Sequence, residues 1–578
     1  MSKTPNFDAK IKILLDVIQP GEKTCALLGT KWMMTDEEIS WYKRFNVPPS
    51  TVAPMTRLRQ LAGFAGGISI WWKPHAETGK LILSFVHPDN LFKVITDKEW
   101  FGKDYVNGFS WDAQKTFFDQ FRKLAHKIPV GSMRDDGSNI DTIGIDLVDT
   151  EGCYMLFGSG EAKRMYYGYM SGTNSEDCVD LTNSGRCRES FQADWCDSLF
   201  KCTQAFRCGD CISCDFIFDC EDCEFCFGAT NKRHKKYLWF NEQLTKEEWE
   251  TRRAAVDLSH FSIFNDHLKR FEGMIAEAAW PEFGHEASME STGEYLISCT
   301  RVHESWWNIR STDIYASWAC LNQQMATFCV WVGWSNDLYQ CCDMVKSQNC
   351  KYCVRVWRSI NVEYSMDCYE CQNCFGCFGL RHKEFCIYNT QYSEADYWKK
   401  LDEIKCAMLD CGEYGMTFPG DLSQSGFQFS MGKMYFDYSP EEYTAFGAPH
   451  FDPARGAVVV PTVINPEEAI QVSDIPDALD DTDPTKFVGK PIVDTKLGRN
   501  FSVTPQEFAF YQAHRLPFPR EHFLTRLKKL TRHSNTPVKM SATCYDCGKP
   551  ITTYVNNIFT DRRMYCREDF FKFIEQNG

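Results

Sequence analysis

The 578-residue sequence contains no uninterrupted apolar stretch that approaches the ~18 residues of a membrane-spanning helix. Its N-terminus has neither an apolar signal core nor a small-residue cleavage site. Basic residues are in the minority, because 63 Lys and Arg are outnumbered by 78 Asp and Glu, which leaves a net charge of −15. These absences predict a soluble cytoplasmic protein that does not bind membranes and has no generally basic surface for nucleic acids.

Sequence signatures of common enzymes are also missing. The chain has no Walker loop, no G-x-G-x-x-G, no G-x-S-x-G and no H-E-x-x-H. We therefore predict a protein that is not an enzyme and has no catalytic residues.

Cysteine, by contrast, is abundant, with 29 residues. Ten of them lie between 178 and 226, and every separation is a multiple of three. Chance would produce this agreement roughly once in twenty thousand sequences. The other residues in the same phase, such as Leu199 and Ala205, are small or apolar. One residue in three is therefore predicted to point into a core.

A second cluster, from Cys299 to Cys386, repeats the period of three, and only Cys342 falls out of phase. A longer period of twelve runs through both clusters, for example in Cys196, Cys208 and Cys220. Four small inward residues per twelve predict a narrow β-solenoid whose coils stack at about 4.8 Å. A bundle of polyproline II segments, which also has a period of three, is the alternative.

The inward set Cys196–Leu199–Cys202–Ala205 resembles the core of the beetle antifreeze β-helix. The outward Thr-x-Thr face of that family is absent here, so the resemblance does not imply antifreeze activity. Because a reducing compartment disfavours disulfides, we expect the core cysteines to be thiols packed as small hydrophobic residues.

Two duplications organise the chain. Residues 219–249 align without gaps on 367–397, with 11 of 31 positions identical. Residues 35–61 align on 504–530, and both copies open with a helix-start signature, Thr followed three residues later by Glu. The first duplication places His234 and His382 in matching Arg-His-Lys segments. Neither histidine has an identifiable carboxylate or nucleophile nearby in the sequence, so both are interpreted as coil caps.

The predicted fold is mainly β, with two cysteine-lined solenoids between related α+β ends. The predicted domains are an N-terminal end module at 1–148, a first solenoid at 149–245, a helical spacer at 246–291, a second solenoid at 292–393, a helix and irregular linker at 394–490, and a C-terminal end module at 491–578. The arrangement resembles uncharacterised cysteine-rich, zinc-ribbon-like proteins of candidate-phylum bacteria, most clearly over 367–393. The chain departs from that family around 48–57 and 493–526, where Pro, Thr, Val and His replace the expected cysteines.

The clearest predicted metal site is Cys544-x2-Cys547-x18-Cys566-x2-Asp569. A CxxC turn followed by Gly548 allows two thiolates to share one zinc ion, and a second pair completes a tetrahedron. Four protein ligands leave no open coordination position, so the site is predicted to be structural rather than catalytic. A redox dithiol is the alternative for the CxxC.

Basic residues surround this segment, and with the aromatic residues Tyr545, Tyr554 and Phe559 they are compatible with nucleic-acid binding through 515–563. They are Arg515, Arg520, Arg526, Lys528, Lys529, Arg532, Lys539, Arg562 and Arg563. The acidic whole favours another interpretation: a non-catalytic scaffold or assembly protein with one structural zinc ion. Its partner would be an unidentified protein or a second copy of the chain. A thiol-based redox or metal-storage protein is the third alternative.

Overall fold

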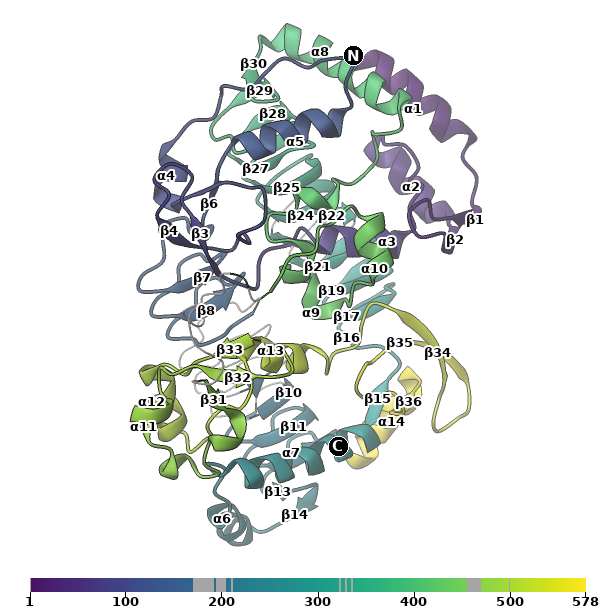
Figure 1. Ribbon diagram of the computed structural model, residues 1–578. Helices are drawn as coiled ribbons and strands as arrows, with labels where there is room; N and C mark the ends of the chain where they lie inside the picture. The colour runs from purple at the N-terminus through teal and green to yellow at the C-terminus, as the bar shows by residue number, and fades with distance from the viewer. Residues whose placement is uncertain are drawn as a thin grey trace. The chain divides into compact units, whose positions relative to one another are not determined.

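A computed structural model of the protein describes residues 2–169, 192–193, 204–208, 211–315, 317–321, 324–327, 330–333, 336–453, 455, 469–497 and 499–578 (Figure 1). Several predicted core cysteines (178, 187, 196, 202 and 329) lie outside the described residues. Helix and strand occur in similar proportions, roughly 30% and 27%. The prediction of a mainly β chain is therefore wrong in its balance, because the end segments and connections form helices.

The chain divides into two compact units that do not follow its order. Unit 1 comprises residues 1–66, 73–132 and 284–451, and unit 2 comprises residues 67–72, 133–283 and 452–578. Unit 1 thus combines the N-terminal end with the second cysteine-rich segment. Unit 2 combines the first cysteine-rich segment with the C-terminal end.

The end segment of unit 1 contains helices and short strands. They are α1 (Pro5–Val17), β1 (Gly21–Thr24), β2 (Lys31–Met34), α2 (Asp36–Phe45), α3 (Pro54–Ala62), β4 (Leu81–Ser84), β5 (Val94–Ile95), α4 (Asp97–Gly102), α5 (Phe117–Lys127) and β6 (Val130–Gly131), while β3 (Trp71–Pro74) enters the unit at Lys73. Helices follow its cysteine-rich segment: α8 (Glu394–Asp410), α9 (Gly432–Tyr435) and α10 (Pro440–Ala445).

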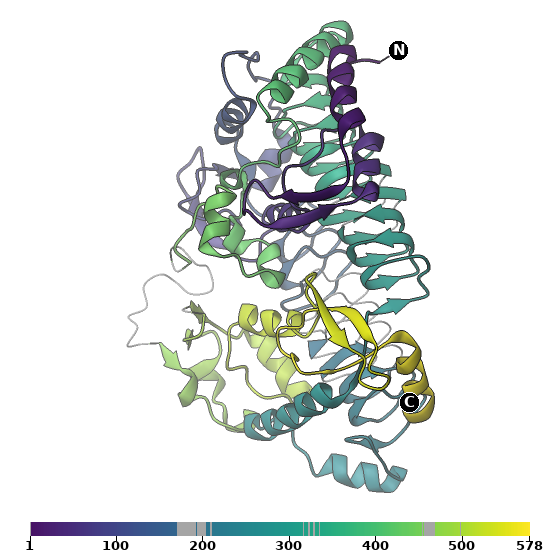
Figure 2. The same ribbon diagram turned by 90° about the vertical axis from the view of Figure 1, so that its right-hand side faces the viewer.

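The cysteine-rich segment of unit 1 forms one extended ladder of short strands (Figure 2). They are β16 (His285–Glu286), β17 (Gly293–Ile297), β18 (Thr300–His303), β19 (Ser305–Ile309), β20 (Thr312–Tyr315), β21 (Trp318–Leu321), β22 (Gln324–Thr327), β23 (Val330–Gly333), β24 (Asn336–Val345), β25 (Lys351–Trp357), β26 (Ile360–Glu363), β27 (Met366–Tyr369), β28 (Gln372–Phe375), β29 (Glu384–Ile387) and β30 (Thr390–Gln391).

Unit 2 has the same kinds of part. Its ladder segment contains β7 (Ile143–Ile145), β8 (Tyr154–Phe157), β9 (Gln192–Ala193), β10 (Gln204–Cys208), β11 (Asp215–Cys220), β12 (Phe227–Thr230), β13 (Leu238–Trp239) and β14 (Glu242–Gln243). The connection forms α6 (Lys246–Ala254), α7 (Phe261–Glu277) and β15 (Ala279–Pro281). The end segment contains β31 (Ile470–Gln471), α11 (Pro484–Phe487), β32 (Ile492–Asp494), β33 (Arg499–Phe501), α12 (Pro505–Ala513), α13 (Phe523–Thr531), β34 (Lys539–Thr543), β35 (Pro550–Tyr554), β36 (Arg563–Tyr565) and α14 (Arg567–Asn577).

Most strands of both ladders pair in parallel with partners twelve residues apart, and the last strand of each, β14 and β30, pairs antiparallel. In unit 1, Cys341 lies opposite Cys353 and Cys374 opposite Cys386. In unit 2, Cys208 lies opposite Cys220. Parallel pairing at this offset places every twelfth side chain in one column, so the period in the sequence reappears as the hydrogen-bonding register.

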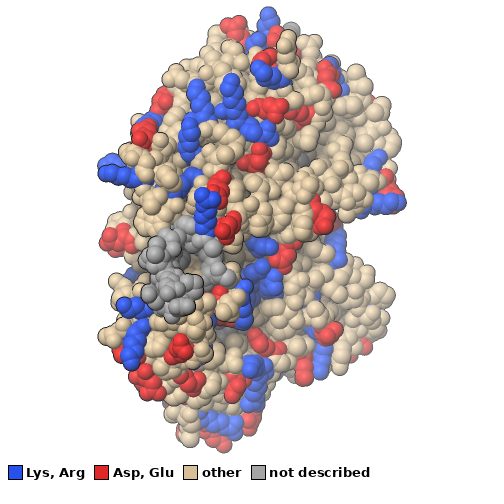
Figure 3. Space-filling model, viewed as in Figure 1, with Lys and Arg blue, Asp and Glu red and all other residues tan. Residues whose placement is uncertain are grey.

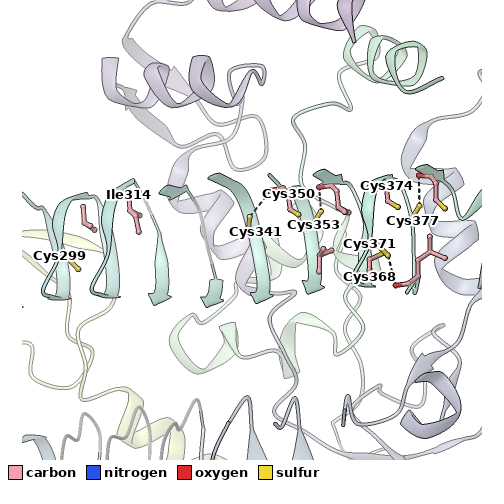
Figure 4. Close-up of a cluster of buried hydrophobic side chains, with 14 of the residues drawn as sticks. Cys299, Ile314, Cys341, Cys350, Cys353, Cys368, Cys371, Cys374 and Cys377 are labelled. Atoms are coloured by element: carbon pink, nitrogen blue, oxygen red, sulfur yellow. Dashed lines mark hydrogen bonds between the residues drawn. The ribbon is translucent and has the colours of Figure 1, made fainter. Parts of the chain in front are cut away.

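The in-phase cysteines whose side chains the structure describes are buried in the two ladders. Cys211, Cys214 and Cys223 are fully buried in unit 2, and unit 1 buries its own set (Figure 4). Each thiol donates to backbone carbonyls; Cys214 Sγ, for example, lies 3.5 Å from the carbonyl oxygen of Cys223. None of the cysteines whose side chains the structure describes is in a disulfide. The thiols therefore fill the core and also join neighbouring turns of the chain.

Non-glycine residues with positive φ recur at every third position of the ladders. Trp307, Arg310 and Asp313, for instance, have φ of 59°, 50° and 57°. The left-handed conformation costs an L-residue about 1 kcal/mol, so a series of such residues requires compensation from its surroundings. Burial of the in-phase side chains and the inter-strand hydrogen bonds supply it.

A buried ion pair joins the end segment of unit 1 to its ladder. Arg57 Nη2 donates to Glu38 at 2.7 Å, and Tyr42 donates to the same carboxylate. Tyr315 of the ladder lies beside the pair, where burial and the Glu38 carboxylate raise its pKa. Glu38 is the third residue of α2, and its N–H donates to the side chain of the N-cap Thr35, as the Thr-x-x-Glu signature predicted.

Unit 2 contains the matching network. Tyr511 donates to Glu507 at 2.9 Å, and Arg526 lies 3.7 Å from that carboxylate. Tyr167 of the ladder donates to Glu507 at 2.6 Å. Thr504 caps α12 as predicted. The two networks are built from corresponding residues. Glu507, Tyr511 and Arg526 lie at the positions that match Glu38, Tyr42 and Arg57 in the duplicated end segments, and Tyr167 and Tyr315 are the matching residues of the two ladders.

An aromatic helix covers each ladder. In unit 1, Phe117 of α5 packs at 5.5 Å from the rings of both Phe375 and Tyr388. In unit 2, Phe264 and Phe271 of α7 pack at 5.7 and 5.9 Å from Phe216. The helix α5 precedes the ladder segment of unit 2 in the chain but covers the ladder of unit 1. The helix α7 precedes the ladder segment of unit 1 but covers the ladder of unit 2.

Among the described helices, none combines the length and the apolar character needed to cross a membrane.

Candidate metal centre

The four predicted metal ligands converge in the C-terminal end of unit 2. Cys544 follows β34, Cys547 lies in the turn before β35, and Cys566 is the N-cap of α14. Asp569 is three residues further, in the first turn of that helix. Gly548 has φ of +71°, which allows the tight turn that brings both cysteines of the CxxC to the same side.

Their ligand atoms have the spacing of a tetrahedral site. All four atoms lie within 4.8 Å of one another. The Sγ atoms of Cys547 and Cys566 are 4.0 Å apart, and Asp569 Oδ2 lies 3.3 and 3.2 Å from the Sγ atoms of Cys544 and Cys566. Sulfur atoms bound to one zinc ion at about 2.3 Å would be about 3.8 Å apart. The group could therefore hold one metal ion without rearrangement of the backbone.

Backbone N–H groups favour the anionic ligands. Burial opposes ionisation of Cys544, but the N–H groups of Cys566, Cys547 and Asp546 outweigh it and lower the pKa of the thiol. The N-terminus of α14 adds its positive dipole end. Lys572 Nζ, 2.9 Å from the second oxygen of Asp569, holds that carboxylate in place.

The site would add a metal bridge to three elements that already contact one another: the β34–β35 hairpin, β36 and α14. β34 and β35 form a hairpin, β36 pairs with β15, and α14 packs through Phe570 against Tyr565 and Ala279. An ion bound by the hairpin turn and by α14 would fix all three. With four protein ligands it would keep no open coordination position for a substrate.

Most of the basic residues near this segment form ion pairs or hydrogen bonds with other residues of unit 2. Several pair with carboxylates or donate to backbone carbonyls, and on the face drawn in Figure 3 Lys and Arg are interspersed with Asp and Glu. The contacts are Arg515 with Asp257 and Asp480, Arg520 with the carbonyls of Ile475 and Pro476, Arg526 with Glu507, Lys529 with Glu521, and Arg562 with the carbonyls of Tyr554 and Phe559.

The two matched histidines do have carboxylate neighbours, contrary to the prediction. His234 Nδ1 lies 3.2 Å from Asp222, and His382 Nδ1 lies 3.0 Å from Glu370. Both histidine side chains are more than two-thirds exposed. The partners escape a search of neighbouring residues because they are twelve positions upstream; the period of twelve was the signal that could have found them.

Comparisons with known proteins identify no relative: no family model, curated protein or solved structure matches the chain.

Proposed function

We propose that Cys544, Cys547, Cys566 and Asp569 bind one structural zinc ion. Thiolates together with a carboxylate suit zinc, and the spacing of the ligand atoms fits a tetrahedral ion of its size. The absence of an open coordination position supports a structural role over a catalytic one. Elemental analysis of purified protein, repeated on Cys566→Ser, should give one zinc ion per chain and none, respectively. Equal metal contents would contradict the assignment.

We further infer that the two ladders are narrow β-solenoids with about twelve residues per coil. Support comes from the twelve-residue register, the buried columns and the positive φ at every third residue. A coil is then an interchangeable unit. Duplicating residues 215–226, one complete coil, should give a folded protein, whereas duplicating residues 215–225 should not, because it shifts every following inward side chain out of phase. Equal stability of the two insertions would contradict a solenoid.

The protein is proposed to act as a non-catalytic scaffold whose partner is another protein or another copy of the chain. The observation that carries this proposal is the use of the cysteines: buried thiols donate to carbonyls along each ladder. Burial raises the pKa of Cys350 to about 12, whereas hydrogen bonds from Cys368 and Cys374 lower the pKa of Cys371; both side chains are buried away from reagents in solvent. A core of this kind supports a rigid body rather than redox chemistry or metal storage.

Thiol counting tests this interpretation against the redox and storage alternatives. In native protein, a thiol reagent should react rapidly with Cys411, which is exposed, and more slowly with the half-buried Cys406. The core cysteines should react only after unfolding, and metal should not exceed one ion per chain. Rapid reaction of core thiols, or several metal ions per chain, would favour the alternatives.

The nucleic-acid alternative has its own test. RNA or DNA binding through 515–563 should depend steeply on salt and be abolished by neutralising Lys528, Lys529 and Arg532 together. Three arginines of the same segment, Arg515, Arg520 and Arg562, are engaged in ion pairs or carbonyl contacts. These arginines therefore have little reach toward phosphate. We therefore expect no salt-dependent shift with either nucleic acid.

A further inference from the structure

The turn that holds Cys544 and Cys547 has three counterparts in the described residues. In each, a residue at the end of a short strand is followed by a turn that faces the N-cap and N3 positions of a helix. Each set consists of the strand-end residue, the residue three positions later, the N-cap and the third helical residue (N3). The four sets, in that order, are Cys25, Leu28, Ala53 and Thr56; His75, Thr78, Thr96 and Glu99; Asp494, Leu497, His522 and Thr525; and Cys544, Cys547, Cys566 and Asp569.

The backbone hydrogen bonds of these turns coincide. The N–H of His75 donates to the carbonyl of Lys80 at 2.8 Å, and that of Gly79 donates to the carbonyl of His75 at 2.9 Å. At Cys544 the same two bonds measure 2.9 and 3.0 Å, and at Cys25 they measure 2.8 and 2.9 Å. The glycines at 29, 79 and 548 have φ of 67°, 70° and 71°. One turn geometry thus occurs in both end segments.

The first side chain of each set also accepts the same bonds. His75 Nδ1 accepts from the N–H groups of residues 77 and 78 at 3.2 and 3.3 Å. Asp494 Oδ1 accepts from those of residues 496 and 497 at 2.9 and 3.0 Å. The sulfurs of Cys25 and Cys544 accept from the corresponding N–H groups. Two backbone donors therefore orient the first ligand position in every copy.

What differs is the contact across the turn. At the C-terminal set, three sulfurs and a carboxylate surround the position of an ion. At the set of His75, the ring Nε2 instead contacts Glu99 Oε2 directly, at 2.7 Å. At the set of Asp494, the second oxygen accepts from the N–H of His522 and from Thr525 Oγ1, both at 2.8 Å. At the set of Cys25, the sulfur bonds to Ala53 N–H and Thr56.

We propose that all four are copies of one metal-binding motif, and that in three of them a direct hydrogen bond takes the place of the ion. The set of His75 is the copy closest to a working site. Imidazole and carboxylate are both zinc ligands, so His75 and Glu99 already supply two of four. The proposal rests on the zinc assignment of the Cys544 set for its reference geometry.

The two missing ligands fall on threonines that match cysteines contact for contact. Thr78 Oγ1 accepts from the N–H of Lys80 at 3.4 Å, as Cys547 accepts from Lys549. Thr96 Oγ1 accepts from the N–H of Glu99 at 3.3 Å, as Cys566 accepts from Asp569. Thr78 is exposed like Cys547, so an ion can reach the turn. Exchange of these threonines for cysteine should complete a tetrahedral set.

The test is the double variant Thr78→Cys/Thr96→Cys in the full chain, with Thr78→Ser/Thr96→Ser as the matched control. Both proteins and the parent are dialysed against metal-free buffer, supplied with zinc or cobalt, and assayed for metal per chain. We expect the cysteine variant to bind one ion more than the parent and to strengthen the cobalt–thiolate absorption, and the serine control to match the parent. A folded cysteine variant with the parent's metal content would overturn the proposal.

One further outcome of the metal assay and one further experiment also test the proposal. If the parent binds no metal while the double variant binds one ion, the zinc assignment at Cys544 fails and this inference stands. If the double variant does not fold, His75→Ala is examined by hydrogen exchange. Loss of the replacing hydrogen bond should speed exchange of the N–H groups of residues 75 and 79 about tenfold, without changing those of residues 544 and 548. Unchanged exchange at residues 75 and 79 would overturn the proposal.

Discussion

The His75 and Cys544 turns have the same backbone hydrogen bonds but differ in the side chains that meet across the turn. The turn at His75 lies next to a packed core in which Phe92, Val94, Ile95 and Trp100 are all buried. Both turns also leave large apolar side chains in water: Leu81 is 61% exposed near His75, and Tyr545 is 60% exposed next to Cys544. A hydrogen bond nets about 1 kcal/mol, whereas structural zinc contributes about 10 kcal/mol. The two turns therefore differ most in the link across them, which is a hydrogen bond at His75 and, as proposed, a zinc ion at Cys544.

Loss of the proposed C-terminal zinc ion should have the largest effect. Cys566→Ser should unfold the last ~50 residues, because about 10 kcal/mol of metal binding is lost. Unit 1 and the ladder of unit 2 should remain folded. Limited proteolysis with mass spectrometry would locate the cleavage, and Cys411→Ser serves as a control cysteine outside the site. A protease-resistant tail in Cys566→Ser would show that packing alone holds this copy.

Transfer of the four side chains of the His75 set into the C-terminal turn tests whether a hydrogen bond can stabilise this turn in place of an ion. The quadruple variant Cys544→His, Cys547→Thr, Cys566→Thr and Asp569→Glu recreates the side chains of the N-terminal set. We expect a tail that is several kcal/mol less stable than the parent with its proposed zinc ion, because one hydrogen bond contributes far less than a bound ion. Hydrogen exchange of α14 measures the difference. Parent-like protection would mean that the hydrogen bond suffices by itself.

The buried carboxylates of the two anchoring networks should behave alike in both units. Glu38→Gln and Glu507→Gln each leave a buried arginine without its anion, which costs about 3–5 kcal/mol. Denaturant unfolding followed by hydrogen exchange should show the loss in unit 1 for the first and in unit 2 for the second. Glu22→Gln, at a carboxylate whose side chain is 59% exposed, is the control. A large loss in only one unit would show that the two networks are not equivalent.

The smallest expected effect is that of acid on the His75 turn, where no thiolate–metal bond is at stake. Hydrogen bonds from Thr96 and the contact with His75 lower the pKa of Glu99 from 4.5 to about 2. Its contribution to stability is complete above about pH 4.5 and is lost as the pH falls toward about 2. Exchange of the N–H groups of residues 75 and 79 should rise over this interval in the parent, relative to Glu99→Gln. An identical pH profile in both would contradict a role for the carboxylate.

Local patterns in the sequence predicted a large part of this structure. The period of twelve gave the strand register, and the Thr-x-x-Glu signatures gave the starts of α2 and α12. The spacing of Cys544, Cys547, Cys566 and Asp569 was sufficient to place them together, since a turn and a helix start bring ligands three residues apart to the same side. Each of these features depends on residues that are close in the chain or on a simple repeat.

Features that depend on distant contacts were missed. Cys342 is out of phase with the other cysteines, yet it is buried because α3 covers it; its Sγ lies 3.9 Å from the carbonyl of Leu61. The carboxylate partners of His234 and His382 lie one period away. The copy of the metal turn at His75 carries no cysteine, so only its hydrogen bonds reveal the relationship.

The sequence by itself determined the repeats, the inward positions and the one complete ligand set, because these are written in spacings of three and twelve residues and in helix-start signatures. Only the tertiary structure decided which copy packs with which. Tyr167 and Tyr315 stand at equivalent places in the two ladders, so local pattern would allow either end segment to join either ladder. Glu38 and Arg57 in fact meet Tyr315, and Glu507 and Arg526 meet Tyr167, across more than 250 residues. Duplicated surfaces carry the same local code, so the choice between them rests on the packing of the whole chain.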